Sequence, residues 1–271
     1  MRKLFFLKLG GSVITNKGLA NTANLEKIDE IANEVHRAQR DDRELVLLLG
    51  HGSGSFGHIA ASKYHTRDGV NTFQQWQGFA DVGSRARALN QIIIERLLLA
   101  GVTAISFSPC SSIIANDRKI IEWNTLLIEK SLLANITPVI YGDVVFDQKS
   151  GGTILSTEEL FEHLAHKLNP ERILLAGLET GVWKDFPSRN ELIAEITPDS
   201  FEVDKKEVRS STSPDVTGGM RSKVEKMLSL VKRLPQLEVQ IFSAMEPENV
   251  YSALMGSKIG TVIRNPGRIK P

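Results

Sequence analysis

Short apolar runs alternate with longer segments of helical periodicity along almost the whole chain, and this alternation limits the possible folds more than any other feature. Apolar runs predict strands at residues 3–10, 43–50, 102–107, 135–147, 172–177, 238–242 and 260–263, and a hairpin return at 151–155. Helices are predicted at residues 24–39, 80–100, 157–168, 219–233 and 247–254. Strands that alternate with helices predict an α/β fold, a three-layer αβα sandwich with a mostly parallel central sheet.

Composition excludes several other classes of protein. A formal net charge of +1 over 271 residues, without a basic patch, gives no sign of a nucleic-acid partner. The single cysteine, Cys110, rules out an intrachain disulfide and a cysteine-based zinc site. The apolar start of the chain is interrupted by Lys8 and is too short for a signal or membrane segment. We therefore expect a cytoplasmic protein without a membrane partner.

The stretch GHGSGSFGH, from Gly50 to His58, follows the second predicted strand. Gly52, Gly54 and Gly57 fit the dinucleotide-binding pattern G-x-G-x-x-G, but that fingerprint normally follows the first strand of its domain. A turn that only permits close packing is a second interpretation. No Lys-Ser or Lys-Thr follows the glycines, which excludes a Walker A loop. The sequence favours a phosphate cradle, in which glycines expose backbone N–H groups beside a helix N-terminus.

A second glycine turn, KLGGS from Lys8 to Ser12, also stands at the end of a predicted strand. The ends of neighbouring parallel strands form one crevice, so two glycine turns there predict a site for two phosphate groups. Lys8, Lys17 and His58 flank these turns. Taken singly, Lys8 could be a strand residue with its amine in solvent, Lys17 a surface lysine, and His58 a helix-capping residue.

Four motifs together resemble the amino acid kinase superfamily and, within it, the isopentenyl phosphate kinases. The motifs are KLGGSVITNK, GHGSGSFGH, PVIYGDVVFD and TGGMRSKV, and they stand in the family's order over nearly the whole chain. The most specific element is the glycine loop ending in Ser-Phe-Gly-His, together with a lysine nine positions after Lys8. A fosfomycin-resistance kinase shares much of this pattern, so a kinase of fosfomycin or another small phosphonate is the alternative.

The resemblance implies a role for individual residues of these motifs. Catalytic roles fall on Lys8, Lys17, His58 and Asp143, with Asp143 orienting the lysines. Nucleotide contacts fall on Gly10, Gly11, Ser12, Gly54, Gly219 and Lys223. Acceptor contacts fall on Ser53, His58 and Gly152. The resemblance also implies ATP and Mg²⁺ as cofactors, no side chain as a metal ligand, and a homodimer. It divides the chain into an acceptor-binding lobe (1–168) and a nucleotide-binding lobe (169–271) that share one continuous sheet.

The sequence departs from the family pattern at two places. Leu178 stands where many relatives carry an aspartate near the nucleotide, which leaves Glu179 as the nearby acid. The family's Ser-Gly-Asp-Asp turn is replaced by LSTEEL, in which Ser156 and Glu159 fit a capping box and receive no chemical role. The segment 204–219 is polar and rich in serine, so we expect a mobile loop that leads into the next helix.

These features predict ATP-dependent phosphorylation of isopentenyl phosphate to isopentenyl diphosphate. The acceptor is already ionised and needs no general base, so cations and positioning carry the catalysis. Phe79 and Val82 could line a pocket for its hydrocarbon, or they could simply pack in the core. A non-catalytic nucleotide-binding storage or regulatory protein is an alternative from another class, and the joint presence of the lysines, His58 and Asp143 argues against it.

Overall fold

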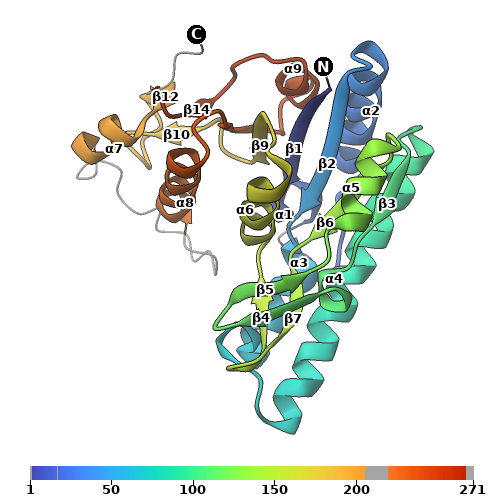
Figure 1. Cartoon of the computed structure of the whole chain (residues 1–271). Coiled ribbons are helices and arrows are strands. Elements are labelled where there is room, and N and C mark those ends of the chain that lie inside the picture. Colours follow the sequence, from blue (N-terminus) through green and yellow to red (C-terminus); the bar gives the residue numbers. More distant parts are fainter. Residues whose placement is uncertain (1, 17, 205–218, 267–271) are drawn as a thin grey trace.

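The computed structural model describes residues 2–16, 18–204 and 219–266, with the side chains of residues 58, 59 and 202–204 left out. Its centre is an eight-stranded sheet with the order β12-β14-β13-β9-β1-β2-β6-β3 (Figure 1). The strands are β1 (Lys3–Leu9), β2 (Leu45–His51), β3 (Ala104–Ser106), β6 (Thr137–Tyr141), β9 (Arg172–Gly177), β12 (Glu195–Ile196), β13 (Glu238–Ser243) and β14 (Thr261–Ile263). The predicted α/β class and central sheet are confirmed.

The sheet is mostly parallel, as the alternation of strands and helices predicts. All its neighbouring pairs are parallel except β13 and β14, which run antiparallel. The sheet is continuous across residues 168 and 169, because β9 from the second predicted lobe pairs with β1 from the first. The division into an acceptor lobe and a nucleotide lobe stays a prediction.

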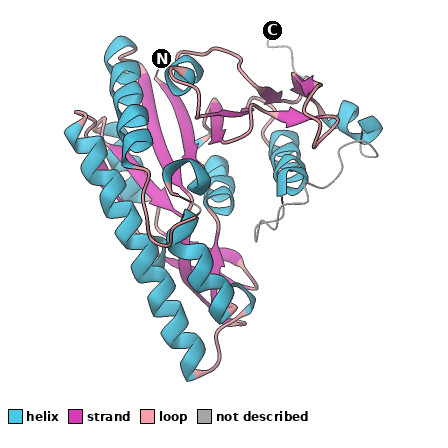
Figure 2. Cartoon of the chain, turned by 180° about the vertical axis from the view of Figure 1, so that it is seen from behind, coloured by secondary structure: helices cyan, strands magenta, loops and turns pink. Residues whose placement is uncertain are grey.

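Helices cover both faces of this sheet and give three layers. One face carries α1 (Gly11–Ile14), α2 (Leu25–Asp41), α4 (Phe73–Leu99) and α9 (Asn249–Leu254). Figure 2 looks onto this face and shows the long α4 in front of the sheet. The other face carries α5 (Leu126–Leu133), α6 (Thr157–Leu168) and α8 (Gly219–Arg233). Side chains alternate along each strand, so Phe5 and Leu7 join the first core while Phe6 joins the second. Lys8 therefore points to the same face as Phe6, toward α6.

A second, four-stranded sheet lies beyond the main one and was not predicted as such. Its order is β5-β4-β7-β8, with the strands β4 (Ile113–Asn116), β5 (Lys119–Trp123), β7 (Asp143–Asp147) and β8 (Gly151–Leu155). The segment 135–147, predicted to carry one strand, carries two, because the chain breaks at Gly142 into β6 and β7. The hairpin return at 151–155 is confirmed, since β8 pairs antiparallel with β7.

The remaining elements are short and lie mostly near the edges of the fold. They are β10 (Val182–Trp183), β11 (Leu192–Ile193), α7 (Pro198–Asp204) and the 3-10 turns η1 (Thr66–Asp68) and η2 (Pro109–Ser111). The segment predicted to be a mobile loop lies almost wholly outside the described residues. Within the described residues, no helix has both the length and the apolar character needed to span a membrane.

Two predicted helix starts are confirmed, and one helix begins earlier than predicted. The capping box of Ser156 and Glu159 is confirmed at α6, and α8 has the predicted bounds. Helix α4 begins at Phe73, well before the predicted Ala80, because Thr72 and Gln75 form a second capping box that the prediction missed. Half of the glycine-rich stretch is helical, because α3 (Gly54–Tyr64) begins within it, and the N-cap of this helix is Ser53 and not His58.

The two glycine turns touch through their backbones at the ends of β1 and β2. A Cβ atom added to Gly11 would lie 2.4 Å from the amide nitrogen of Gly54. Gly54 has a φ of +48°, and a Cβ atom there would lie 2.2 Å from the Thr15 hydroxyl. That hydroxyl donates to the Gly11 carbonyl at 2.7 Å and accepts from the Ser55 amide at 3.0 Å. Both glycines are therefore required by this packing.

We expect Gly54→Ala to lower the free energy of unfolding by roughly 1–3 kcal/mol or more, because it adds a strained φ to a steric overlap. Denaturant unfolding of the purified protein measures this change. Gly18→Ala is the matched control, since its added Cβ atom would have its nearest neighbour at 3.5 Å. Equal stability of the two variants would contradict the close approach of the turns.

Candidate functional site

The candidate site lies where the carboxyl ends of β1, β2 and β9 meet. The Gly10 amide donates to the Ala176 carbonyl at 2.8 Å, and the Gly52 amide donates to the Leu9 carbonyl at 3.0 Å. These bonds fix both glycine turns to neighbouring strand ends. Helices α1 and α3 begin at Gly11 and Gly54, and the first N–H groups of a helix have no acceptor within it. The two turns therefore lie side by side, and the phosphate site that they would form stays a prediction.

Lys8, near the end of β1, forms an ion pair with Glu158 in the first turn of α6. Both side chains are largely buried, with 13% and 14% of their surface exposed. Burial acts to raise the pKa of Glu158, but the charges of Lys8 and Lys223 outweigh it and hold the pKa at about 2. Glu158 is therefore ionised at neutral pH.

Lys223 of α8 lines one small pocket with Glu158, and its charge also lowers the pKa of this carboxylate. Glu158 lines a small pocket at the starts of α6 and α8, together with Ser156, Gly219, Ser222, Lys223 and Lys226. The structure thus brings Lys8, Gly219 and Lys223 to one place. Their combined charge with Glu158 is positive, which suits phosphate groups.

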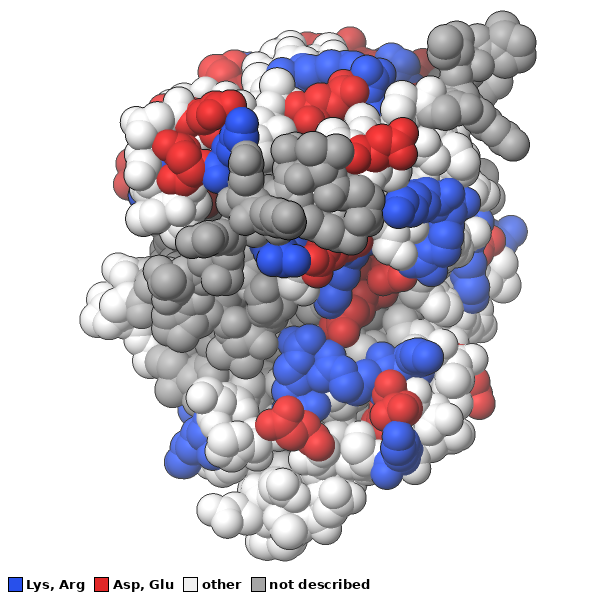
Figure 3. Space-filling model, turned by 90° about the vertical axis from the view of Figure 1, so that its left-hand side faces the viewer, with Lys and Arg blue, Asp and Glu red and all other residues white. Residues whose placement is uncertain are grey.

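The neighbouring Glu159 has a separate set of partners. Its carboxylate accepts the Ser156 amide at 2.7 Å in the capping box. Arg118 donates to it at 3.0 Å, and Arg67 and Lys226 lie at 3.7 and 4.0 Å. Basic and acidic side chains also meet in a hollow in the middle of the face seen in Figure 3. Glu159 therefore ties α6 to the second sheet and to α8.

Asp143 is placed differently from the prediction that it orients the lysines. Its carboxylate accepts the amides of Val144 at 2.9 Å and Cys110 at 3.3 Å, with the Ser108 hydroxyl at 3.5 Å. Burial raises the pKa of Asp143 to about 7 despite these donors. In this structure the carboxylate paired with Lys8 is Glu158, and a direct role for Asp143 stays a prediction.

The other predicted residues are distributed as follows. Ser12 lies in α1, Ser53 is the N-cap of α3, and His58 lies in the second turn of α3 with its side chain outside the description. Lys17 lies outside the described residues. Gly152 lies in β8, where an added Cβ atom would meet the Phe79 ring at 2.8 Å. The structure thus gives Gly152 a packing role and leaves its phosphate role a prediction.

Phe79 and Val82 pack in a third, smaller apolar cluster between α3, α4 and the β7–β8 hairpin. Both are nearly buried, at 6% and 3% exposure, so in this structure they are core residues. The Phe79 ring meets Trp76 edge-to-face and lies tilted against Phe146, with ring centroids 5.3 and 5.2 Å apart. Phe146 is half exposed, which leaves one edge of the aromatic group open to a ligand.

Glu179 belongs to an exposed polar group in the second half of the chain. Its carboxylate pairs with Arg189 at 2.7 Å and accepts from the Trp183 indole at 3.2 Å. Leu178 is 42% exposed. In the described residues, no group of three or more His, Cys, Asp or Glu side chains could hold a metal ion.

Glu158 is the residue that the sequence prediction missed. The capping box explains Ser156 and Glu159, but it gives no reason to assign a role to Glu158, which lies between them. One signal was available, because a lysine buried in an apolar strand needs a carboxylate partner. The sequence alone could not identify that partner, which lies 150 positions away.

Comparisons with known proteins agree with this geometry. A family model described as the amino acid kinase family matches residues 3–243. The chain is 33% identical to the isopentenyl phosphate kinase of Methanocaldococcus jannaschii, over 96% of this chain and 98% of that one. It is 30% identical to the isopentenyl phosphate kinase of Arabidopsis thaliana, over 83% of each chain.

Solved structures give the same result. A crystal structure of isopentenyl phosphate kinase superposes with a TM-score of 0.80 at 29% identity, over 96% of this chain and 99% of that one. A structure of an isopentenyl phosphate kinase substrate complex gives a TM-score of 0.76 at 25% identity, over 96% and 100%. Together with the matched family model, these similarities show that the chain belongs to the amino acid kinase family.

Proposed function

We propose that this protein transfers the γ-phosphoryl group of ATP to isopentenyl phosphate and so forms isopentenyl diphosphate. The observation that carries the proposal is the meeting of Lys8 and Lys223 at Glu158, beside two glycine turns. The similarity to isopentenyl phosphate kinases over nearly the whole chain supports the choice of acceptor.

The charge of the two substrates explains why these residues are needed. A phosphate monoester is close to a dianion at neutral pH, and it must approach the equally negative γ-phosphate. Catalysis of phosphoryl transfer consists mainly of positioning and of offsetting this charge. Lys8 and Lys223 supply two cations, and Glu158 pairs with the first and lines one pocket with the second. The attacking phosphate oxygen is already ionised, so no general base is required.

The nucleotide would be held on the side of Gly10, Gly11 and Lys223, where helix starts and a lysine gather. ATP supplies the phosphoryl group, and Mg²⁺ would come bound to its phosphates, because Mg²⁺ is commonly held by phosphates with few protein ligands. His58 and Lys17 are assigned to the acceptor and transferred phosphate by family resemblance. The exposed edge of the Phe79 cluster would receive the hydrocarbon.

We also infer that the protein forms a homodimer through the edge of the main sheet. The strand β3 is an edge strand, and its Ile105 is 44% exposed. Beside it, Leu98 and Leu99 at the end of α4 are 52% and 77% exposed. An open edge strand flanked by apolar side chains is a surface that proteins normally cover.

A coupled assay of ADP release with several acceptors tests the reaction. We expect isopentenyl phosphate to be turned over far better than isopentenol or N-acetylglutamate, because only the phosphorylated acceptor uses the cations of the site. Fosfomycin tests the phosphonate alternative, and a reaction without acceptor tests simple ATP hydrolysis. Comparable rates with a non-phosphorylated acceptor would overturn the assignment.

The Lys8–Glu158 pair gives the first kinetic prediction. Lys8→Ala should lower kcat on the order of 100-fold or more, as for other lost electrostatic partners of a transition state. Glu158→Gln should lower kcat by at least about 10-fold because Lys8 loses its buried partner, and Glu158→Asp should recover part of this loss. The control is Glu162→Gln in the same helix, whose surface pair with Arg233 should not affect the kinetics. Near-normal kcat in both Lys8→Ala and Glu158→Gln would contradict the site.

His58 gives the second kinetic prediction. If its imidazole donates a charge-assisted hydrogen bond to the acceptor phosphate, His58→Ala should lower kcat/KM for isopentenyl phosphate about 10- to 150-fold. ATP affinity, measured separately, should stay nearly unchanged. His65→Ala is the matched control, since that exposed histidine caps the end of the same helix. Wild-type kcat/KM in His58→Ala would show that the histidine has no part in acceptor binding.

A further inference from the structure

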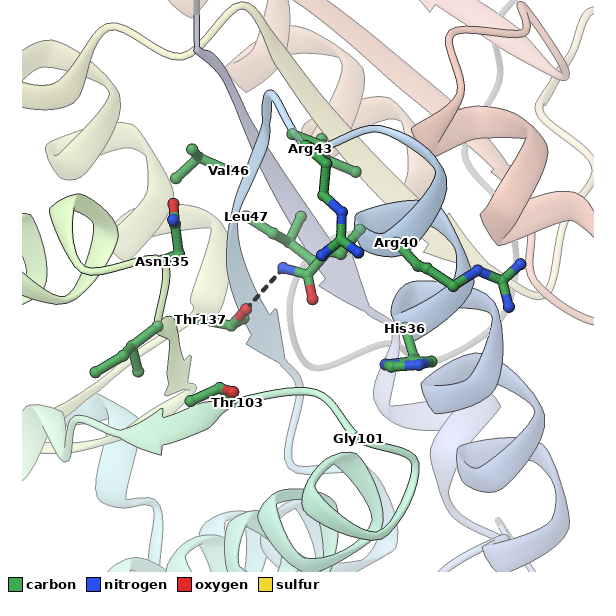
Figure 4. Close-up of a pocket in the computed structure, with 12 residues that line it drawn as sticks. His36, Arg40, Arg43, Val46, Leu47, Gly101, Thr103, Asn135 and Thr137 are labelled. Carbon is green, nitrogen blue, oxygen red and sulfur yellow. Dashed lines mark hydrogen bonds between the residues drawn. The ribbon is translucent and has the colours of Figure 1, made fainter.

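We propose that a cavity at the amino ends of β2 and β6 is a second binding site, specific for a small phosphate-bearing anion. The cavity has a volume of about 240 Å³. This is several times the roughly 30 Å³ that one water occupies in the liquid, so a polyatomic anion fits. It is lined by His36, Gln39, Arg40, Arg43, Leu45, Val46, Leu47, Gly101, Thr103, Asn135, Ile136 and Thr137 (Figure 4).

The cavity lies at the amino ends of the strands, whereas the candidate kinase site lies at their carboxyl ends. Strand β2 begins at Leu45, which lines the cavity, and ends at His51, whose neighbour Gly52 belongs to the glycine turn. A strand of this length separates its ends by roughly 20 Å. A ligand in the cavity would therefore not touch the groups assigned to phosphoryl transfer, and the inference is independent of the activity proposed above.

The charged side chains of the cavity wall are all basic. Its twelve described lining residues include two arginines and one histidine, and none of them is an aspartate or glutamate. Two neighbouring carboxylates have partners, and one of them, Asp41, pairs with Arg40 of the cavity wall itself. Asp42 pairs with Lys3 at 2.8 Å, and Asp41 pairs with Arg40 at 2.9 Å and accepts from the Tyr251 hydroxyl at 3.1 Å.

The two arginines differ in what else they do. Arg40 lies in the last turn of α2, where a cation offsets the helix dipole, and it is paired with Asp41. Arg43 lies beyond the end of that helix and makes no ion pair within the described part of the chain. Figure 4 shows Arg43 pointing toward Thr137, while Arg40 points away from it. Arg43 thus supplies the unneutralised charge of the cavity.

Neutral donors surround this charge on the other walls. The Gln39 amide donates to the Thr137 hydroxyl at 3.0 Å, which leaves the second amide hydrogen and the hydroxyl hydrogen for a ligand. Thr103 and Asn135 add a hydroxyl and an amide. An arginine beside several neutral donors is the donor set that phosphate and carboxylate groups select, and the fork of a guanidinium matches phosphate oxygens.

The histidine wall is formed by a close contact. Gly101 has a φ of +92°, and a Cβ atom there would lie 2.9 Å from the His36 ring. The absence of a side chain at Gly101 therefore lets the imidazole lie against the turn after α4, where it forms part of the cavity wall. Leu45 and Leu47, which share one face of β2, and Ile136 add apolar side chains to the lining, which suits a phosphate attached to a short organic group.

The test is calorimetric titration of the full chain with diphosphate and with inorganic phosphate, at constant ionic strength. The kinase site also attracts phosphate, so the titrations are made in a Lys8→Ala background. We expect this background to retain a binding event that Arg43→Ala weakens at least tenfold, as for loss of a charged hydrogen bond. Gln39→Glu should weaken it similarly, because it places a carboxylate in the cavity with almost no change of shape.

Two controls separate this result from general effects. Arg85→Ala removes an arginine that pairs with Asp81 on the surface of α4, and it should leave the binding event unchanged. In the wild-type background, Arg43→Ala should leave kcat with the preferred acceptor unchanged. The proposal is wrong if Lys8→Ala alone abolishes the binding of both anions, or if Arg43→Ala and Gln39→Glu both bind diphosphate as tightly as their Lys8→Ala parent.

Discussion

The backbone contact between the two glycine turns is the constraint on which the site depends. Gly11 and Gly54 approach so closely that neither has room for a side chain. This contact fixes the end of β1 against the end of β2, and it sets the first N–H groups of two helices side by side. The lysine that precedes the first turn is thereby aimed at α6. A looser contact would separate the backbone donors from the lysine that must act with them.

Two adjacent glutamates at the start of α6 divide the work of connecting the molecule. Glu158 pairs with Lys8 of β1 and shares a small pocket with Lys223 of α8, while Glu159 closes the capping box and binds Arg118 from the second sheet. Consecutive residues of a helix point in directions about 100° apart, so one turn can face two neighbours. The start of α6 is itself fixed to β2, because the Thr157 hydroxyl donates to the His51 carbonyl at 2.6 Å. The four residues 156–159 at the start of α6 therefore carry both its ion pairs and its contact with β2.

The sequence predicted those parts of the fold whose signals are local. Strand β1, helix α8 and the capped start of α6 have apolar patterns or caps that can be read without tertiary information. The hairpin β4–β5 has no such signal. Its turn residues Asp117 and Arg118 both have positive φ, and the Asp147 carboxylate holds them by accepting their amides at 3.2 and 2.8 Å. A turn stabilised by a residue about 30 positions away cannot be recognised from its own sequence.

The site shows the same limit. Glycine turns and a lysine in an apolar strand identify a phosphate site, because few other structures need those residues together. The carboxylate that holds the lysine could not be identified, since the pairing depends on how α6 crosses the sheet. Asp143 was the more conspicuous acid in the sequence, yet its carboxylate is bound by the amides of Cys110 and Val144.

The reversal of β14 has a practical consequence for work with this protein. Because β14 runs antiparallel to β13, its last residue, Ile263, pairs with Val239 near the amino end of that strand. Lys3, the first residue of β1, lies at the same end of the strands. Labels attached at Lys3 or at Ile263 would therefore lie at the strand ends opposite the glycine turns. They would lie at the strand ends that carry the Arg43 cavity, so anion titrations are best made with unlabelled protein.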